Sequence, residues 1–371
     1  MDQPVLDRQI TVKVSALDGS RWTLEISGEV HVGELKAKLE CLTGVPAREE
    51  QLLWREEILE DSSTMACFAG ASNCVSLTLV RVARHRVVAL GGGTIARLSA
   101  EFYDSASGLW SALPGMLTPR HGLAAASCGH QVFAIGGEDC LGRVLSSVEC
   151  FDVTTLVWSE APGMSTGRYT HAATSITGQL FVVGGQDEVG STLGCGEAFD
   201  IEAGTWSRLP ELNTPRHSHA LVAVNNRELL VFGGIGDGAR ALGSGEVLNL
   251  EGGSRVWALL PDMRVPRYSL AAVVWEGLVY VLGGKDDDGR AQVIVEAFDY
   301  PAGSWFEIAA MSVARHALAA VSTETGIYVL GGRSTDHDAL ASVEVYSTES
   351  CWVTASRMGS ARSGLAGAVV C

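Results

Sequence analysis

The sequence predicts a mainly β protein, in which a small α+β domain precedes a six-bladed β-propeller closed by the C-terminal strand. Three observations predict this. A four-part pattern recurs six times, and its Trp and Arg residues follow one another at intervals of 47–51 residues. The chain ends on a fragment of one further repeat, and its first eighty or so residues lack the pattern. Glycine, at 43 of 371 residues, is abundant enough for many tight turns.

The repeat consists of a Gly-Gly pair, a Glu two residues before an aromatic residue or Leu, a Trp and an Arg. The Gly-Gly pairs are Gly91/Gly92, Gly136/Gly137, Gly184/Gly185, Gly233/Gly234, Gly283/Gly284 and Gly331/Gly332. The Glu residues are Glu101, Glu149, Glu197, Glu246, Glu296 and Glu344, and the Trp residues are Trp110, Trp158, Trp206, Trp257, Trp305 and Trp352. Apolar runs such as VVAL and LFVV before each pair are typical of buried strands. Four short strands per repeat indicate a propeller blade.

The two ends of the repeat region are complementary. The first repeat starts at its second strand, near residue 87, and lacks a first strand. The chain ends with SGLAGAVVC, which is a first strand without a second. We therefore expect residues 364–370 to form the innermost strand of the first blade, because this pairing removes two open sheet edges.

The N-terminal region is predicted to form a separate small domain over residues 10–82. An extension over residues 1–9 precedes this domain, and a linker over residues 83–86 follows it. Apolar residues alternate on both sides of Asp18-Gly19, which indicates a β-hairpin. Helical spacing follows from Val32 to Leu39, and two short strands near 52–54 and 77–80 complete an α+β roll.

The repeats resemble those of the Kelch family. The shared features are the apolar run into Gly-Gly, the Glu-x-aromatic-Asp step, the spaced Trp and Met-x-x-x-Arg, as in Met116 to Arg120. It extends over residues 87–371. The fourth repeat departs from the pattern, since Leu248 and Asn249 replace the aromatic residue and Asp, so its outer edge is expected to be less regular.

The N-terminal domain resembles ubiquitin, through TVKVSALDGSRWTLEI, GELKAKLE, TGVP and ILED. The apolar contact patch of ubiquitin maps to Leu17, Leu53 and Val80, which are all still apolar; the alternative is that they are ordinary sheet residues. The conjugated Gly-Gly end of ubiquitin maps to His85-Arg86 and is absent. The resemblance therefore implies a built-in docking module rather than a conjugated tag.

Composition excludes some classes of partner. The formal net charge is −16, which argues against nucleic-acid and anionic-membrane binding, since both depend on clustered positive charge. Nine cysteines without a CxxC pair, and an N-terminus unlike a signal peptide, predict a cytoplasmic or nuclear protein.

No catalytic, cofactor or metal site is predicted. His217 and His219 lie close in sequence, but the other histidines come from different repeats and do not have the spacing of metal ligands. The run of three Asp before Gly289 lacks the later acidic ligand of a calcium loop.

The repeat arginines and the residues after them form the predicted binding site at the mouth of the propeller. They are Arg120, His121, Arg168, Tyr169, Arg216, His217, Arg267, Tyr268, Arg315, His316, Arg362 and Ser363. Such a ring could bind the carboxylates of an acidic peptide. The alternative is structural: each Arg pairs with a repeat Glu or with backbone carbonyls.

The sequence therefore predicts a non-catalytic interaction protein. In this interpretation the propeller binds a protein or acidic peptide cargo, and the ubiquitin-like domain docks to a ubiquitin receptor, a ligase or the proteasome. One alternative is a cytoskeletal or general scaffold, and a second is a sugar-modifying or small-molecule enzyme built on the same fold.

Overall fold

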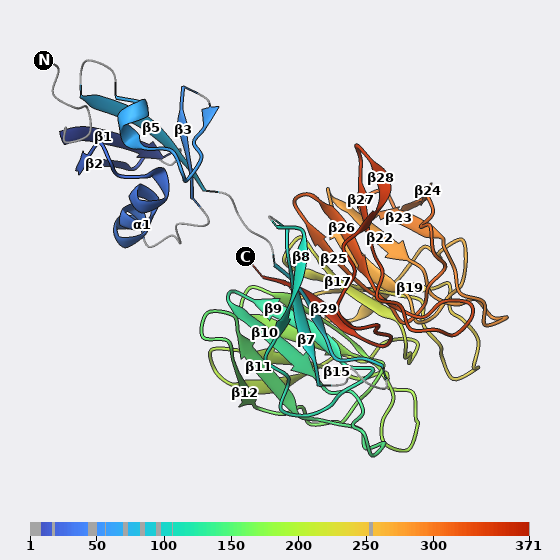
Figure 1. Ribbon diagram of the computed structural model, residues 1–371. Helices are drawn as coiled ribbons and strands as arrows, with labels where there is room; N and C mark the ends of the chain where they lie inside the picture. Colours follow the sequence, from blue (N-terminus) through green and yellow to red (C-terminus); the bar gives the residue numbers. More distant parts are fainter. Residues whose placement is uncertain are drawn as a thin grey trace, which may run out of the picture. The chain divides into compact units, whose positions relative to one another are not determined.

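The computed structural model describes residues 9–16, 19–43, 50–55, 57–69, 73–81, 86–93, 98–105, 107–251 and 255–370. The chain divides into two compact units, Met1–Arg84 and His85–Cys371 (Figure 1). No helix within the described ranges is long and apolar enough to cross a membrane.

In its described residues, the N-terminal unit has a five-stranded sheet and one α-helix. Its elements are β1 (Gln9–Ala16), β2 (Arg21–Ser27), α1 (Val32–Thr43), β3 (Glu50–Trp54), β4 (Glu57–Ile58), the 3₁₀ turn η3 (Met65–Cys67) and β5 (Cys74–Arg81). The sheet order is β2-β1-β5-β3-β4, with β1 and β5 parallel. The alternating apolar residues of β1 and β5 pack with Val32, Leu35 and Leu39 of α1 in one core. This is the α+β roll that the sequence predicts.

The C-terminal unit is a propeller of six four-stranded sheets. Blade one contains β29 (Ala366–Val370), β6 (Arg86–Leu90), β7 (Ala100–Asp104) and β8 (Leu109–Leu113). Blade two contains β9 (Ala124–Cys128), β10 (Gln131–Ile135), β11 (Val148–Asp152) and β12 (Val157–Ala161). Blade three contains β13 (Ala172–Ile176), β14 (Gln179–Val183), β15 (Gly196–Asp200) and β16 (Thr205–Leu209).

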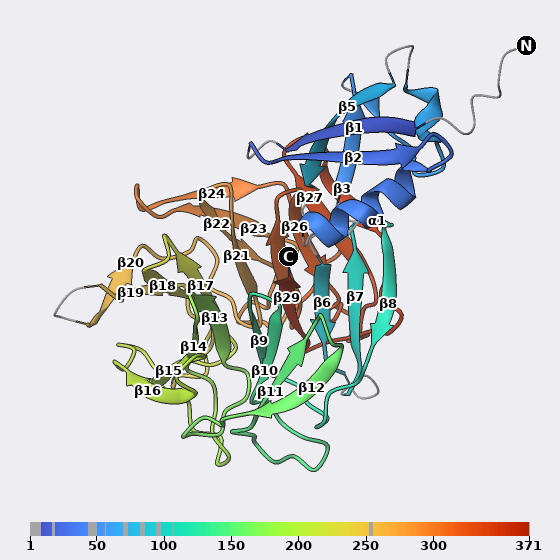
Figure 2. The ribbon, with the colours of Figure 1, turned by 90° about the vertical axis from the view of Figure 1, so that its left-hand side faces the viewer.

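The remaining blades have the same strand order. Blade four contains β17 (Ala220–Val224), β18 (Glu228–Phe232), β19 (Gly245–Asn249) and β20 (Trp257–Leu260). Blade five contains β21 (Ala271–Trp275), β22 (Leu278–Leu282), β23 (Val295–Asp299) and β24 (Ser304–Ile308). Blade six contains β25 (Ala319–Thr323), β26 (Gly326–Leu330), β27 (Val343–Ser347) and β28 (Cys351–Ala355). Figure 2 shows the first strands near a common centre and the fourth strands at the rim.

The C-terminal strand completes blade one, as predicted. β29 is antiparallel to β6, with Ala366 opposite Leu90 and Val370 opposite Arg86. The strand begins at Ala366 rather than at residue 364. Gly364 has a φ of +62°, which is incompatible with extended backbone.

A closed ring of backbone hydrogen bonds joins the blades just before the first, innermost strand of each blade. One residue per blade donates its N–H to the carbonyl of its counterpart in the preceding blade, at 2.7–3.0 Å. The six residues are Gly122, Thr170, Ser218, Ser269, Ala317 and Gly364. All six have φ between +49° and +62°. The ring therefore requires the C-terminal segment, which supplies its sixth member.

The repeat Trp residues join the outer parts of neighbouring blades. Each indole N–H donates to a carbonyl just after the fourth strand of the preceding blade, as Trp158 does to Pro114 at 2.9 Å. Trp110 of blade one donates to Ser356 of blade six at 2.9 Å, which closes this set around the ring. Blade four departs from the pattern as expected, since β20 is one residue shorter than the other fourth strands.

Removal of the closing strand tests this account of ring closure. Truncation after Arg362 leaves the β6 edge unpaired and removes Gly364 from the hydrogen-bonded ring. We expect aggregation or loss of a cooperative thermal transition, because β6 becomes an open edge and the hydrogen-bonded ring is broken. Deletion of Cys371 alone, which spares β29, is the control. A soluble truncation that melts at the temperature of the full chain would contradict this expectation.

Candidate functional site

The six repeat arginines lie in the connections between blades, just before each inner strand. All six are 0% exposed, and they are the largest fully buried side chains in the described part of the protein. Every one forms an ion pair of 2.6–2.9 Å with the repeat Glu of the blade that it enters. The charge of each guanidinium is thus neutralised inside the fold.

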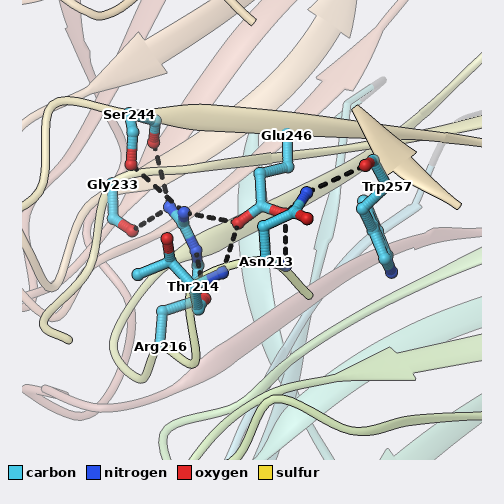
Figure 3. Close-up of polar contacts among 7 residues, drawn as sticks. All are labelled: Asn213, Thr214, Arg216, Gly233, Ser244, Glu246 and Trp257. Atoms are coloured by element: carbon cyan, nitrogen blue, oxygen red, sulfur yellow. Dashed lines mark hydrogen bonds and ion pairs between the residues drawn. The ribbon is translucent and has the colours of Figure 1, made fainter. Parts of the chain in front are cut away.

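Arg216 shows the full set of contacts (Figure 3). Its Nη1 donates to the carbonyls of Gly233 and Ser244, both at 2.9 Å. Its Nη2 donates to the Glu246 carboxylate at 2.9 Å and to the Ser244 hydroxyl at 3.2 Å. Burial lowers the pKa of Arg216, and the Glu246 carboxylate opposes that shift. The side chain therefore remains a cation that fixes both the Gly-Gly turn and the third strand of its blade.

The partner Glu also holds the incoming chain. Glu246 accepts the backbone N–H groups of Asn213 and Thr214 at 2.8 and 3.0 Å. Meanwhile the carbonyl of Arg216 accepts the N–H of Gly185 in the preceding blade at 2.9 Å. Each Arg–Glu pair thus links one Gly-Gly turn to the next.

This geometry favours the structural interpretation of the arginines over the ligand-binding one. Arg120, Arg168, Arg216, Arg267, Arg315 and Arg362 have no exposed surface and bond a repeat Glu and two backbone carbonyls each. A ligand would have to replace these contacts inside the protein. The expectation that these guanidinium groups bind an acidic peptide at the mouth is corrected accordingly.

The residues after the arginines do lie at the inner rim. His121, Tyr169, His217, Tyr268 and His316 each form a β-bridge with the residue that follows a Gly-Gly pair, namely Glu138, Gln186, Ile235, Lys285 and Arg333. His316 and Ser363 are buried, and the other four are partly exposed. These predicted residues therefore lie at the same end of the propeller as the residues that follow the Gly-Gly pairs. The sequence analysis did not select those residues.

Two basic side chains lie at the rim of blades five and six, next to acidic residues of the same loops. Burial, with the charges of Asp286 and Asp287, raises the pKa of Tyr268, which forms a β-bridge with Lys285. Lys285 and Arg333 follow the fifth and sixth Gly-Gly pairs, and no ion pair to either is found in the described part of the chain. Burial is the largest cause that lowers the pKa of His316 to about 4, and the positive charges of Lys285, Arg333 and His337 contribute to this shift. The contribution of these charges, unlike that of burial, favours an anion beside His316.

The acidic residues of the adjoining loop already have partners. Asp286 accepts the backbone N–H of Arg290 at 2.9 Å, and Asp287 accepts that of Ala241 at 2.6 Å. Asp288 pairs with Arg290 at 2.8 Å. A cleft of about 310 Å³ lies between this loop and the loop that starts at Ser334. Its polar lining includes Lys285, Ser334 and Thr335.

Two buried histidines interrupt an apolar position of the repeat. His171 and His219 are 6% and 5% exposed, and neither ring forms a hydrogen bond of good geometry. The other four blades have Leu there: Leu123, Leu270, Leu318 and Leu365. Burial and the adjacent Arg168 lower the pKa of His171 to about 3. Burial, Arg216 and His171 lower the pKa of His219 well below its ordinary value.

The sequence-predicted patch of the N-terminal unit is described only in part. Leu53 lies on β3 and is partly exposed. The backbone of Val80 on β5 pairs with that of Gln51 on β3. Leu17 and the side chain of Val80 lie outside the described residues.

Comparison with protein families identifies both units. The KLHDC2/KLHL20/DRC7 Kelch-repeats domain matches residues 76–269 and 170–371, and the ubiquitin family matches residues 10–69. The chain belongs to this Kelch-repeat family. Its N-terminal domain is ubiquitin-like, and the two matches confirm the predicted fusion.

A solved structure described as "Structure of YjhT" has the same fold. Its TM-score is 0.65 at 15% sequence identity, and the alignment covers 73% of this chain and 94% of that one. No curated protein matches this chain at a significant level. Kelch and ubiquitin-like domains together indicate a role in protein interaction.

Disruption of one Arg–Glu pair tests its structural role. Arg216→Met leaves the Glu246 carboxylate buried without its cation. We expect a loss of about 3–5 kcal/mol in stability, because an unpaired buried charge is costly. The measurement is the melting temperature, which should fall by on the order of 5–10 °C. The exposed Arg208→Met is the matched control, and equal melting of the two variants would contradict the structural role.

The buried histidines predict an acid-sensitive propeller. A folded-state pKa below the ordinary value of about 6.5 means that the unfolded chain binds protons first as the pH falls. Stability is therefore full above about pH 7 and is lost towards the value of about 3 for His171. We expect His171→Leu with His219→Leu to raise the melting temperature, with a larger gain at pH 5 than at pH 7.5. A gain independent of pH would exclude titration of these groups as its cause.

Proposed function

We propose that this protein is a non-catalytic adaptor, whose propeller binds an acidic segment of a partner protein and whose ubiquitin-like domain docks to a receptor of the ubiquitin system. The observation that carries the first half is the pair of basic side chains at the rim of blades five and six. The chain as a whole has a net charge of −16, and the loop that begins at Lys285 also contains Asp286, Asp287 and Asp288. At the rim, Lys285 and Arg333 have no ionic partner in the described ranges.

An acidic segment fits the rim better than a neutral one. The cleft beside Lys285 also presents the hydroxyl groups of Ser334 and Thr335, which can donate to carboxylate oxygens. His316 is neutral at pH 7, because its pKa is about 4, and a neutral imidazole can donate one further hydrogen bond. The basic side chains and the hydrogen-bond donors therefore support the same class of ligand. In this proposal the acidic peptide binds at the rim and not at the six buried arginines.

The second half of the proposal rests on the ubiquitin-like sheet. On its sheet, Leu53 pairs with Thr78 on one side and with Ile58, which is 61% exposed, on the other. Neighbouring apolar residues with exposed surface are suited to anchor an interface. With no Gly-Gly at the domain's end, docking rather than conjugation is the role that this domain would perform.

Peptide binding tests the rim. The probe is a fluorescein-labelled octapeptide of Gly, Asp and Glu, and the measurement is fluorescence anisotropy at 50 and 200 mM salt. We expect Lys285→Ala with Arg333→Ala to weaken binding by about tenfold, and to reduce its salt dependence, since charge pairs at the rim are screened by salt. Arg208→Ala, on the outermost strand of blade three, is the control. Unchanged affinity in the double variant would overturn the assignment of the rim.

Docking is tested with isolated ubiquitin-binding domains. Leu53→Ala should weaken their binding more than fivefold, because truncation of an apolar anchor costs more than about 1 kcal/mol. Leu42→Ala, at an exposed Leu of α1, is the matched control. The absence of binding by the wild-type chain would leave the scaffold alternative as the better interpretation and refute docking.

A further inference from the structure

The loop between the second and third strands of blade six presents a hydroxyl group at its tip. Two backbone hydrogen bonds close this loop: the N–H of Ser334 donates to Asp338 at 3.0 Å, and the N–H of His337 donates to Ser334 at 3.1 Å. Thr335 lies inside this turn, and its side chain is exposed. No hydrogen bond of the Thr335 hydroxyl is found in the described part of the chain. The hydroxyl is therefore accessible to a modifying enzyme.

The residues after Thr335 have the charge pattern of a phosphorylation site. Asp336 follows it directly, and Asp338 follows it three residues later. Both carboxylates are exposed, and no ion pair to either is found among the described residues. No other Ser or Thr in the sequence is followed by acidic residues at both of these positions. Acid-directed protein kinases recognise such carboxylates through basic side chains of their own.

The loop of blade five shows what a negative group does at this position. It has the same two backbone hydrogen bonds, at 3.2 and 3.0 Å. Gly289 and His337 occupy the same place in the two loops, with φ of +74° and +66°. Asp287 of blade five therefore corresponds to Thr335 of blade six. The Asp287 carboxylate accepts the backbone N–H of Ala241, in the loop of blade four, at 2.6 Å. A negative group at this position thus links its loop to that of the preceding blade.

Ala291 of blade five is the counterpart of Ala241 of blade four. Each forms a β-bridge with the residue after the Gly-Gly pair of its own blade, Ala241 with Ile235 and Ala291 with Lys285. Ala291 is 9% exposed, and no acceptor for its N–H is found in the described ranges. Ala291, Lys285 and Thr335 all line the cleft of about 310 Å³ between the two loops. The cleft therefore combines a hydroxyl, a backbone donor and a basic side chain, none of which has a partner among the described residues.

We propose that Thr335 is a phosphorylation site for an acid-directed protein kinase, and that its phosphate binds in the cleft between the loops of blades five and six. In this reaction the Thr335 Oγ attacks the γ-phosphorus of ATP. The bond from that phosphorus to the β,γ-bridging oxygen breaks and ADP leaves, while the hydroxyl proton passes to the catalytic carboxylate of the kinase. The phosphate then accepts the N–H of Ala291 and pairs with Lys285, so it makes the link that Asp287 makes to Ala241.

The modification regulates the rim, and this consequence rests on the proposed function. Lys285 is one of the two basic side chains assigned above to an acidic segment. The carboxylates of Asp286, Asp287 and Asp288 are each held by other donors, so Lys285 remains for the phosphate. A phosphate carries about −1.5 to −2 charges at pH 7, so it neutralises Lys285 and repels a second anion. The phosphorylated protein is therefore the form that releases an acidic segment.

Phosphorylation of the full chain tests the site itself. The protein is incubated with ATP and a purified acid-directed Ser/Thr kinase, and mass spectrometry locates and counts the phosphates. We expect Thr335 to be the principal site, and Thr335→Ala to remove it. Asp338→Asn should slow incorporation about fivefold or more, because it removes one recognised charge and keeps the acceptor. Asp237→Asn, at an exposed Asp in the loop of blade four, is the matched control. Absence of phosphate at Thr335 in the wild-type chain would overturn the proposal.

Nuclear magnetic resonance of the ¹⁵N-alanine-labelled chain tests where the phosphate binds. The amide resonance of Ala291, identified with Ala291→Gly, should move downfield on phosphorylation as its N–H gains an acceptor. The resonance of Ala241 should not move, since Asp287 already accepts its N–H. An unchanged Ala291 resonance in the phosphorylated protein would refute binding in the cleft.

The acidic octapeptide then tests the regulation. We expect the phosphorylated protein to bind it about tenfold more weakly than the unmodified protein, because like charges repel at the rim. Equal affinity of the two forms would refute the regulatory role. If the unmodified protein does not bind the peptide at all, the proposed function fails, whereas the phosphate at Thr335 and the Ala291 resonance still decide the modification site.

Discussion

The buried Arg–Glu pair is the interaction on which the rest of the propeller depends. Each Arg is 0% exposed and ties a Gly-Gly turn and a third strand to the chain that enters the blade. Its own carbonyl accepts an N–H from the preceding Gly-Gly turn. Because a buried charge without a partner is costly, the pair and its hydrogen bonds must form together. Repetition of this unit makes the six blades equivalent and places the residues after each Gly-Gly at one rim.

That constraint also separates the parts of the repeat that can vary from those that cannot. Arg and Glu occur in every blade, whereas the residue after Gly-Gly ranges from Gly93 and Glu138 to Lys285 and Arg333. The second group lies at the rim, where no buried charge depends on it. Binding specificity can therefore differ between blades without loss of the fold, which is the usual relation between a rigid scaffold and its loops.

Departures from the repeat fall into two physical classes. His171 and His219 replace an apolar side chain inside the protein, so they reduce stability in acid. Leu248 replaces an aromatic residue and is fully buried in the apolar core, so it changes packing without removing a hydrogen bond. Neither change affects an Arg–Glu pair, which is why blades three and four keep the same strand order as the others.

The folds of the two domains, the number of blades and the closing strand could be predicted from the sequence, because the repeat period, the strand pattern and the incomplete ends of the repeat are local features of the chain. The role of the arginines could not be predicted in this way. A recurring Arg and a recurring Glu, 29 or 30 residues apart in five blades, are compatible with either a pair or an open ring. Which of them forms depends on the depth at which the chain buries both side chains. The same holds for Lys285 and Arg333, whose shared rim results from the circular arrangement of blades that are distant in sequence.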